Sequence, residues 1–234
     1  MSSASQRTSV ILPVRNGERF IAEAIRSALS QLAADDEIVV VDDASSDATR
    51  SVIAGMEEPR VRLLGGSGRG VSSARNIGLA AATGEFIAFL DHDDLWPSAR
   101  HAALLGSLLA NTEIDCAVGR LRVRMEHDAI PLANVATMDG KLVPSISLCT
   151  GLFRRRILDL VGGFDEDMKF AEDSDYFMRL MERNYRVALC DVDALIYRRH
   201  GSNATNDRAG AEDGAMQLMR RRRVRLSRRE TGTR

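Results

Sequence analysis

The sequence contains no long apolar run, few cysteines and few aromatic residues. No apolar stretch approaches the roughly 20 residues that a helix needs to cross a bilayer, and the start, Met-Ser-Ser-Ala-Ser-Gln-Arg, lacks the apolar core of a secretory signal. The three cysteines, Cys116, Cys149 and Cys190, are widely separated and show no metal-ligand spacing, so we interpret them as buried thiols in a reducing compartment. These absences predict a cytoplasmic globular protein.

Basic residues are concentrated at the carboxyl end, although the chain of 234 residues has a net charge of only −1. Residues 217–234 contain eight arginines and one glutamate. Such a run favours contact with anionic lipid or nucleic acid, or else a solvated, frayed C-terminal helix. The scarcity of aromatic residues between the arginines argues against nucleic acid. The tail is left with three interpretations: a peripheral contact at the inner face of the membrane, a homodimer contact and a solvated helix.

The remaining sequence alternates strand and helix signals, which predicts an α/β fold with a parallel sheet covered on both faces. Strand-like runs at 9–14, 37–41, 61–64 and 85–90 alternate with helical patterns at 18–32, 47–56 and 72–82. Further helices are expected at 97–111, 154–161 and 172–183, and further strands at 116–123, 186–190 and 194–198. Residues 125–145 indicate a long loop with room for a hairpin, of the kind that often binds acceptors.

Three carboxylates, Asp91, Asp93 and Asp94, follow the apolar strand at 85–90, with His92 between them. In α/β sheets, ligands bind at the carboxyl ends of the strands. Carboxylates placed together repel one another unless a cation or hydrogen-bond donors lie between them. A hard divalent ion would fill this role and keep positions for a diphosphate. The alternative interpretation is a solvated turn that caps the following helix.

Two further acidic clusters favour a binding site over an isolated turn. Asp42 and Asp43 end the strand at 37–41, and Glu172, Asp173 and Asp175 open the helix at 172–183. Three such clusters at the ends of elements indicate a single site for a polyanion and a metal ion. The glycine-rich segment 65–70 lacks the Gly-Lys-Ser/Thr ending of a P-loop and the spacing of a dinucleotide fingerprint, so an oxidoreductase is weakly supported.

Taken in order, these motifs resemble those of family 2 glycosyltransferases, inverting enzymes of the GT-A fold that use nucleotide-diphosphate sugars. The matching segments are Pro13-Val-Arg-Asn16, 41–49, 74–78, 84–94, 162–166, 172–175 and 197–200. The resemblance implies a mixed, mostly parallel central sheet flanked by helices. It also implies one GT-A domain at residues 1–206, with a nucleotide-binding half at 8–95 and an acceptor-binding half at 96–206, followed by the arginine-rich helix or tail at 207–234.

The resemblance assigns donor binding to the end of the first strand and to the loops beside it. The residues concerned are Pro13, Val14, Asn16, Glu18, Asp42, Asp43, Arg75, Asp91 and His92. A carboxylate can accept the imide N–H of uracil, which favours a UDP-sugar as the donor. Arg75 is expected either near the base or diphosphate or in a salt bridge to one of the nearby carboxylates.

The resemblance also implies a divalent cation, Mn²⁺ or Mg²⁺, held by Asp93 and His200, which neutralises the departing diphosphate. A structural role for His200 is the alternative. Asp173 corresponds to the catalytic base that faces the acceptor hydroxyl, and the dipole of its helix is expected to lower its pKa. Gly151, Glu172 and Asp175 are expected near the acceptor or as capping and supporting residues.

The sequence departs from the family pattern at two places. His92 stands where small residues are usual, and Arg221 stands where a tryptophan would complete the Gln-x-x-Arg-Trp signature of processive synthases. We therefore expect transfer of a single sugar to a hydroxyl acceptor, which can be a glycan, a glycolipid or a small molecule. One alternative is a nucleotidyltransferase, which needs a basic loop near the amino terminus, where only Arg15 and Arg19 are available. The other is a non-catalytic nucleotide-sugar or membrane-surface binding module.

Overall fold

The amino-terminal half of the chain forms the parallel part of a mixed sheet. The computed structural model describes residues 6–130, 142–143 and 147–230. Its first elements are β1 (Thr8–Val14), α1 (Ile21–Leu29), β2 (Glu37–Asp42), α2 (Thr49–Ala54), β3 (Val61–Gly65), α3 (Val71–Ala81) and β4 (Phe86–Phe89). Strand β1 pairs in parallel with both β2 and β4, and β2 pairs in parallel with β3. The predicted strand–helix alternation is thus confirmed.

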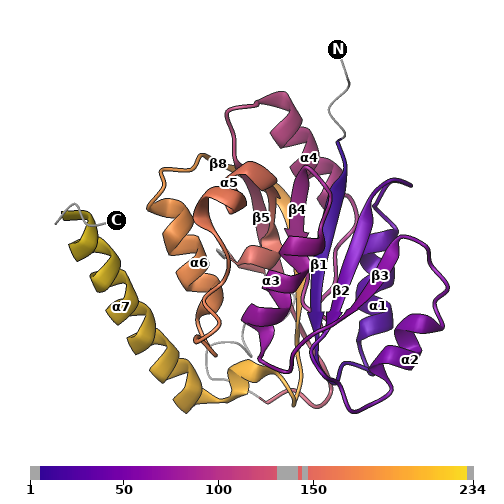
Figure 1. The fold of residues 1–234 in the computed structure, drawn as a ribbon. Helices are drawn as coiled ribbons and strands as arrows, with labels where there is room; N and C mark the ends of the chain where they lie inside the picture. Colours follow the sequence, from indigo (N-terminus) through magenta and orange to yellow (C-terminus); the bar gives the residue numbers. More distant parts are fainter. Residues whose placement is uncertain (1–5, 131–141, 144–146, 231–234) are drawn as a thin grey trace.

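The carboxyl-terminal half extends the same sheet with strands that pair in both directions. Its elements are α4 (Arg100–Ala110), β5 (Cys116–Met125), β6 (Leu142–Val143), the 3-10 turn η2 (Leu148–Thr150), β7 (Gly151–Arg154), α5 (Arg155–Val161), α6 (Glu172–Met181), β8 (Val187–Arg199), the 3-10 turn η3 (Ala204–Asn206) and α7 (Arg208–Glu230). The strand order is β3-β2-β1-β4-β7-β5-β6, with β8 on β5. Figure 1 shows the helices packed around this sheet and α7 on the far side of α6.

The alternation of side chains along β2 explains why helices cover both faces of the sheet. Ile38 and Val40 belong to the main core, whereas Val39 and Val41 pack with Ala74 of α3 on the opposite face. All four are fully buried. A strand buried on both faces has no solvated side, so its sequence is continuously apolar.

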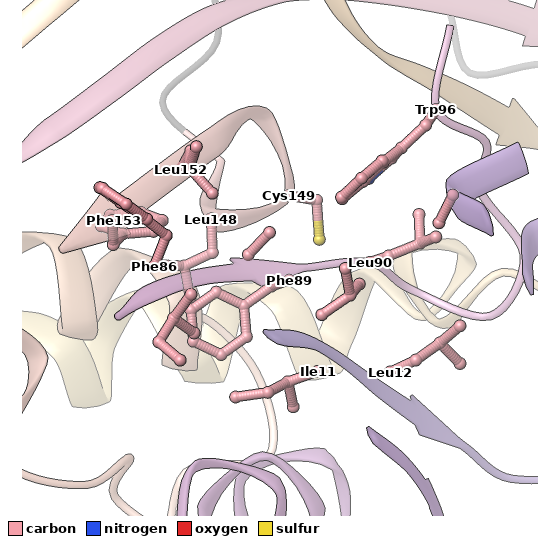
Figure 2. Close-up of a cluster of buried hydrophobic side chains, with 14 of the residues drawn as sticks. Ile11, Leu12, Phe86, Phe89, Leu90, Trp96, Leu148, Cys149, Leu152 and Phe153 are labelled. Atoms are coloured by element: carbon pink, nitrogen blue, oxygen red, sulfur yellow. The ribbon is translucent and has the colours of Figure 1, made fainter. Parts of the chain in front are cut away.

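The largest core surrounds β4, the central strand of the sheet. Figure 2 shows Phe89 and Leu90 between Ile11 and Leu12 on one side and Leu148 and Cys149 on the other. This packing fixes the end of β4, and the acidic segment that follows it therefore leaves the sheet from a rigid base.

The structure corrects two details of the predicted strands. The segments at 186–190 and 194–198 form one continuous strand, β8, which pairs in parallel with β5 through register shifts near Arg120. The expected hairpin is represented by the antiparallel pairing of β5 with β6, while residues 131–141 and 144–146 of the predicted acceptor loop lie outside the described residues. Strand β7 was not predicted, because its four residues are buried by long-range pairing with β4 and β5.

Candidate active site

Arg75 joins two of the three predicted acidic clusters. It lies on α3, its side chain is 2% exposed, and its Nη2 donates to Asp91 at 2.9 Å. Its Nη1 donates to Glu172 at 2.9 Å and to Asp173 at 2.5 Å. The segment after β4 and the first turn of α6 are therefore held together by one guanidinium, which is the salt-bridge alternative foreseen for Arg75.

The charges at this junction do not balance, because one arginine faces three carboxylates. Burial acts against the charge of Arg75, but Asp173, Asp91 and Glu172 raise its pKa well above the usual value, so it stays a cation. The Cζ of Arg75 also lies 5.5 Å from the centre of the Phe164 ring. The excess negative charge makes the site receptive to a further cation.

Asp173 has the protonation behaviour of a base that works near neutral pH. Burial raises its pKa to about 7, with Arg75 acting in the opposite direction and Glu172 and Asp91 adding to the rise. The pKa is therefore raised, whereas the position at a helix N-terminus led us to expect a lowered one, because burial and the neighbouring carboxylates outweigh Arg75. A general base with a pKa near the working pH combines an available lone pair with sufficient basicity.

Asp93 and His200 face each other on the other side of the acidic segment. The Nε2 of His200 lies 3.0 Å from the Oδ2 of Asp93, and the side-chain amide of Asn203 donates to the same oxygen at 3.3 Å. The His200 side chain is 2% exposed and that of Asp93 is 17% exposed. Burial opposes ionisation of Asp93, yet the hydrogen bond with His200 keeps its pKa below the usual value. Asp93 is therefore an anion at neutral pH.

This pair fits two neighbouring positions in the shell of a small divalent ion. Neighbouring ligand atoms in an octahedral shell of radius about 2.1 Å lie about 3.0 Å apart, which matches the Asp93–His200 separation. Within the described part of the chain, no group of three or more His, Cys, Asp and Glu side chains has the geometry of a metal site. The remaining ligands would have to be water and substrate oxygens, as is usual for Mg²⁺ at diphosphates.

Ser202 contacts Nδ1 of His200 through both its backbone and its side chain. The hydroxyl of Ser202 lies 2.9 Å from Nδ1 of His200. Nδ1 also accepts the backbone N–H of Ser202 at 3.3 Å, so Nε2 carries the proton and donates it to the carboxylate of Asp93. A cation at Nε2 would have to displace this proton, and the Ser202 hydroxyl, which can accept, would then hold the proton on Nδ1. A partner of this kind on the second ring nitrogen is typical of histidines that bind metals.

Asp94 belongs to the predicted acidic cluster but was assigned no individual site role, and in the structure its carboxylate holds the backbone of Arg198. It is 2% exposed, and its Oδ1 accepts the backbone N–H of Arg198 at 2.9 Å. Burial and the neighbouring Asp93 and Asp91 raise its pKa well above the usual value. The contact ties the segment after β4 to the end of β8, two residues before His200. The run of three aspartates in the sequence signalled a cluster but could not separate this anchor from its neighbours.

Asp42 and Asp43 end β2, and both are already hydrogen-bonded. Asp42 accepts the backbone N–H of Ser45 at 3.3 Å and pairs with Arg50 at 2.9 Å. Asp43 accepts the N–H groups of Gly68 and Gly70, both at 2.7 Å. Asp43 thus holds the glycine-rich segment that leads into α3 and to Arg75.

Other predicted donor residues lie beside this edge of the sheet. Pro13 and Val14 end β1, opposite Val41 and Asp42 of β2. The Oδ1 of Asn16 accepts the N–H of Ser46 at 2.8 Å, and a carboxylate oxygen of Glu18 accepts the N–H of Ala48 at 2.8 Å. These two side chains connect the loop after β1 to the loop after β2. The His92 ring lies against Gly17, where a Cβ would approach Cδ2 of the ring to 2.6 Å.

The three residues expected near the acceptor lie in different surroundings. Glu172 belongs to the Arg75 cluster. Gly151 begins β7 and its carbonyl accepts a hydrogen bond from Arg100 at 2.9 Å. Asp175 is 1% exposed and pairs with Arg179 at 2.9 Å and Arg225 at 2.6 Å, so it fixes helices rather than facing a ligand.

Arg19, one of the two basic residues near the amino terminus, is already paired with a carboxylate. Arg19 donates to the carboxylate of Asp128 at 2.6 Å and lies over the Phe20 ring at 4.5 Å. It is therefore engaged with the segment after β5. A nucleotidyltransferase, which needs this side chain for phosphate, loses support from this contact.

Comparison with known proteins identifies the class of this fold and then the family. Three crystal structures of residues 1–349 of TarS from S. aureus share the fold, and the complex with UDP-GlcNAc superposes with a TM-score of 0.68 at 22% identity, covering 86% of this chain and 61% of TarS 1–349. The mixed sheet is therefore that of the GT-A fold. The sequence profile of glycosyl transferase family 2 matches residues 9–223. The chain belongs to this family.

Two bacterial glycosyltransferases are among the relatives of this chain. The uncharacterized glycosyltransferase EpsJ of Bacillus subtilis (strain 168) is 30% identical over 214 residues, covering 84% of this chain and 62% of EpsJ. The Escherichia coli protein named UDP-Glc:alpha-D-GlcNAc-diphosphoundecaprenol beta-1,3-glucosyltransferase WfgD is 39% identical over 104 residues, covering 44% of this chain and 41% of WfgD. The chain thus spans less than two thirds of the length of either relative.

Proposed function

We propose that this protein is an inverting, metal-dependent glycosyltransferase that moves one sugar from a nucleotide-diphosphate sugar to a hydroxyl group. Family membership supports the reaction class. The arrangement that carries the proposal is the Arg75 junction, which holds Asp173 beside the acidic segment after β4. Such a junction brings a base and a diphosphate-binding segment to the same edge of the sheet.

A uridine nucleotide is the preferred donor in this proposal. TarS has been crystallised with UDP and with UDP-GlcNAc, and the name of WfgD gives UDP-Glc as its donor. The same name describes an acceptor sugar attached to a lipid diphosphate, so a hydroxyl on a membrane-borne glycolipid is the acceptor that we favour. The predicted homodimer and the membrane contact of the tail are not needed for the chemistry.

The proposed reaction is a single displacement at the anomeric carbon. The acceptor oxygen forms a bond to this carbon while the bond from the carbon to the β-phosphate oxygen breaks, which inverts the configuration. Asp173 accepts the hydroxyl proton and later releases it to water, and the nucleoside diphosphate leaves with the bonding electrons. Arg75 keeps Asp173 oriented, and the raised pKa of Asp173 makes the carboxylate a competent base at neutral pH.

Asp93 and His200 are the residues that would hold the divalent cation, with Ser202 fixing the orientation of the imidazole. When bound, the ion supplies charge neutralisation for the departing diphosphate. Asp91 keeps its pairing with Arg75. Asn16, Glu18, Asp42, Asp43 and His92 line the proposed donor side. Asp42 would contact the base by exchanging its exposed partner Arg50, while Asp43 keeps the glycine-rich segment in place.

Calorimetric titration tests the proposed donor site without knowledge of the acceptor. UDP, GDP and dTDP are titrated into the wild-type protein with and without Mn²⁺. We expect UDP to bind more tightly with Mn²⁺, and Asp93→Asn to remove this metal dependence. Asp159→Asn, which makes the same change on the exposed face of α5, is the matched control. Metal-independent binding of UDP would remove Asp93 and His200 from their proposed roles.

Turnover separates an enzyme from a binding module. UDP release is followed with UDP-sugars and a membrane lipid extract as the source of acceptors. The wild-type protein should release UDP, and Asp173→Asn should bind UDP normally but lose turnover. Tight UDP binding without turnover in the wild-type protein, across UDP-glucose and UDP-N-acetylglucosamine, would instead favour the non-catalytic module.

A further inference from the structure

The inner face of α7 is attached to the helix that carries Asp173. Arg225 pairs with Asp175 at 2.6 Å and with Glu182 at 3.3 Å, both on or next to α6, and Arg221 pairs with Asp165. Leu218 is 8% exposed, so this face also contributes to packing. Helix α7 is therefore docked rather than frayed along this face, and Figure 1 shows it running alongside α6.

The opposite face of α7 combines long apolar side chains with unpaired arginines. Met216, Met219 and Leu226 are 53%, 61% and 40% exposed. Their spacing of three and seven residues places them on one side of the helix. Arg222 and Arg223 are exposed beside them and pair with no carboxylate within the described parts of the chain. We call this set the outer face of α7.

The sequence of the outer face narrows the kind of partner. Between Met216 and Ser227 the helix has no acidic residue and no aromatic residue. Pairing two copies through this face would bring their arginines together without a counter-charge, which is unfavourable. Nucleic acid would leave the exposed methionines and leucine without an apolar partner, and no aromatic side chain is available for stacking on bases. An anionic lipid surface provides both phosphate charges and an apolar layer.

The start of α7 is fixed to the proposed metal-binding residues. Asn206, at the end of the 3-10 turn that precedes α7, donates from its amide to the carbonyls of His200 at 3.2 Å and Gly201 at 2.8 Å. Arg199 donates to the side chain of Asn206 at 2.6 Å. A surface bound along α7 would therefore be held at a defined place relative to the catalytic edge of the sheet.

We propose that the outer face of α7 docks this protein on an anionic membrane surface and so presents the active site to acceptors held in that membrane. The part about acceptors rests on the proposed function, whereas the docking itself does not. Across the described residues, no helix is both long and apolar enough to span a membrane.

Vesicle co-sedimentation tests the proposal on the full chain, without nucleotide or metal. The probes are phosphatidylcholine vesicles with and without phosphatidylglycerol. The wild-type protein should sediment with the anionic vesicles and should not sediment with the neutral ones. Because each arginine at an anionic surface contributes roughly a fivefold change in partition, Arg222→Gln with Arg223→Gln should weaken binding by about 30-fold. Arg26→Gln with Arg186→Gln removes the same charge from exposed positions elsewhere and should leave most of the binding intact.

The apolar side chains are tested separately from the charges. Met219→Ser with Leu226→Ser should weaken binding to anionic vesicles at about 0.1 M salt, and should abolish the binding that remains at about 1 M salt, where charges are screened within about 3 Å. Circular dichroism and thermal unfolding confirm that each variant is folded. UDP binding by calorimetry should be unchanged in every variant, so a failure of docking is distinguishable from a failure of the proposed function.

Three results would overturn the proposal. Absence of wild-type binding to anionic vesicles would refute docking directly. Equal losses for the α7 pair and the Arg26/Arg186 pair would show that net charge, and not the outer face, controls binding. A wild-type dimer in sedimentation velocity that dissociates on Met219→Ser with Leu226→Ser would assign the outer face to a second copy of the chain.

Discussion

Removing the charge of Arg75 should destabilise the protein in a pH-dependent way. Arg75→Met keeps a long apolar side chain but leaves Asp91, Glu172 and Asp173 without the cation that now lies within 2.9 Å of each. Breaking a buried ion pair costs about 3–5 kcal/mol. Here the carboxylate side chains are 34%, 14% and 27% exposed, so water screens part of the repulsion. We expect a loss of about 3 kcal/mol in the free energy of unfolding at about pH 8.5.

The loss should be much smaller in mild acid, because protons can replace the missing cation. The pKa of Asp173 in the folded protein is already raised to about 7, and removal of Arg75 raises it further. A carboxyl whose pKa is higher in the folded than in the unfolded state is stabilising below the unfolded pKa, and this contribution is lost as the pH rises through the folded pKa. In the wild-type protein, the loss of stability caused by ionisation of Asp173 is complete a little above about pH 7. In the variant, the higher pKa of Asp173 extends this loss to higher pH. Each unit of additional pKa adds about 1.4 kcal/mol to the difference.

Urea unfolding at about pH 5.5 and about pH 8.5 measures both quantities. Arg186→Met is the control, because Arg186 and its partner Glu113 are 61% and 68% exposed, and a surface pair contributes under about 1 kcal/mol. Arg75→Lys should retain part of the stability that Arg75→Met loses. The lysine ammonium keeps the positive charge, but it lacks the two Nη groups with which the guanidinium contacts Asp91 and Asp173 at the same time. A deficit of equal size at both pH values would refute the charge-balance account of this junction.

Three further changes probe the neighbouring residues. Asp173→Asn should lower turnover by about 10²–10⁴-fold with no loss of thermal stability. Turnover of the wild-type protein should fall as the pH drops below about 7, because Asp173 becomes protonated. A turnover profile that is flat between about pH 5 and about pH 8 would contradict the assignment of Asp173 as the base. Ser202→Ala should weaken Mn²⁺ affinity by about 10–100-fold through His200 while UDP binding without metal persists, which calorimetry measures. Arg225→Ala should cost only about 1–2 kcal/mol in unfolding experiments, because Asp175 keeps Arg179 as a partner; a loss above about 4 kcal/mol would mean that Arg179 does not compensate.

Most strands and helices could be predicted because their burial follows the local period of the sequence. The apolar runs of β2 and β4 and the spacing of α1 and α3 are visible in the sequence and agree with the structure within a few residues. The exceptions depend on long-range pairing. Strand β7 has only four residues and includes Gly151 and Arg154, so its pattern does not differ from that of a loop. Strand β8 was predicted as two pieces because Asp191 and Asp193 interrupt its apolar pattern, although both have arginine partners on β5.

The acidic clusters could be located from the sequence, but their connections could not. Arg75 is separated by 98 residues from Asp173, and nothing local to α3 indicates that its guanidinium reaches α6. The same limit applies to Asp93 and Asp94, which are neighbours in the sequence but have different roles. Asp94 accepts a hydrogen bond from the backbone of Arg198, whereas Asp93 pairs with the side chain of His200. Family resemblance located the residues, whereas side-chain direction distinguished anchors from candidate ligands.

The placement of hydrogen bonds also shows which predicted donor residues are available to a ligand. Side-chain oxygens of Asn16 and Glu18 accept hydrogen bonds from backbone N–H groups of the loop after β2. Both carboxylate oxygens of Asp43 accept hydrogen bonds from the glycine-rich segment. Asp93 is different, because its carboxylate faces another side chain that can itself bind a metal ion. A ligand gains more by replacing a contact between two potential ligands than by breaking a loop anchor, since a broken anchor leaves a backbone donor unsatisfied. This difference makes Asp93 and His200 the residues at which donor and metal binding should begin.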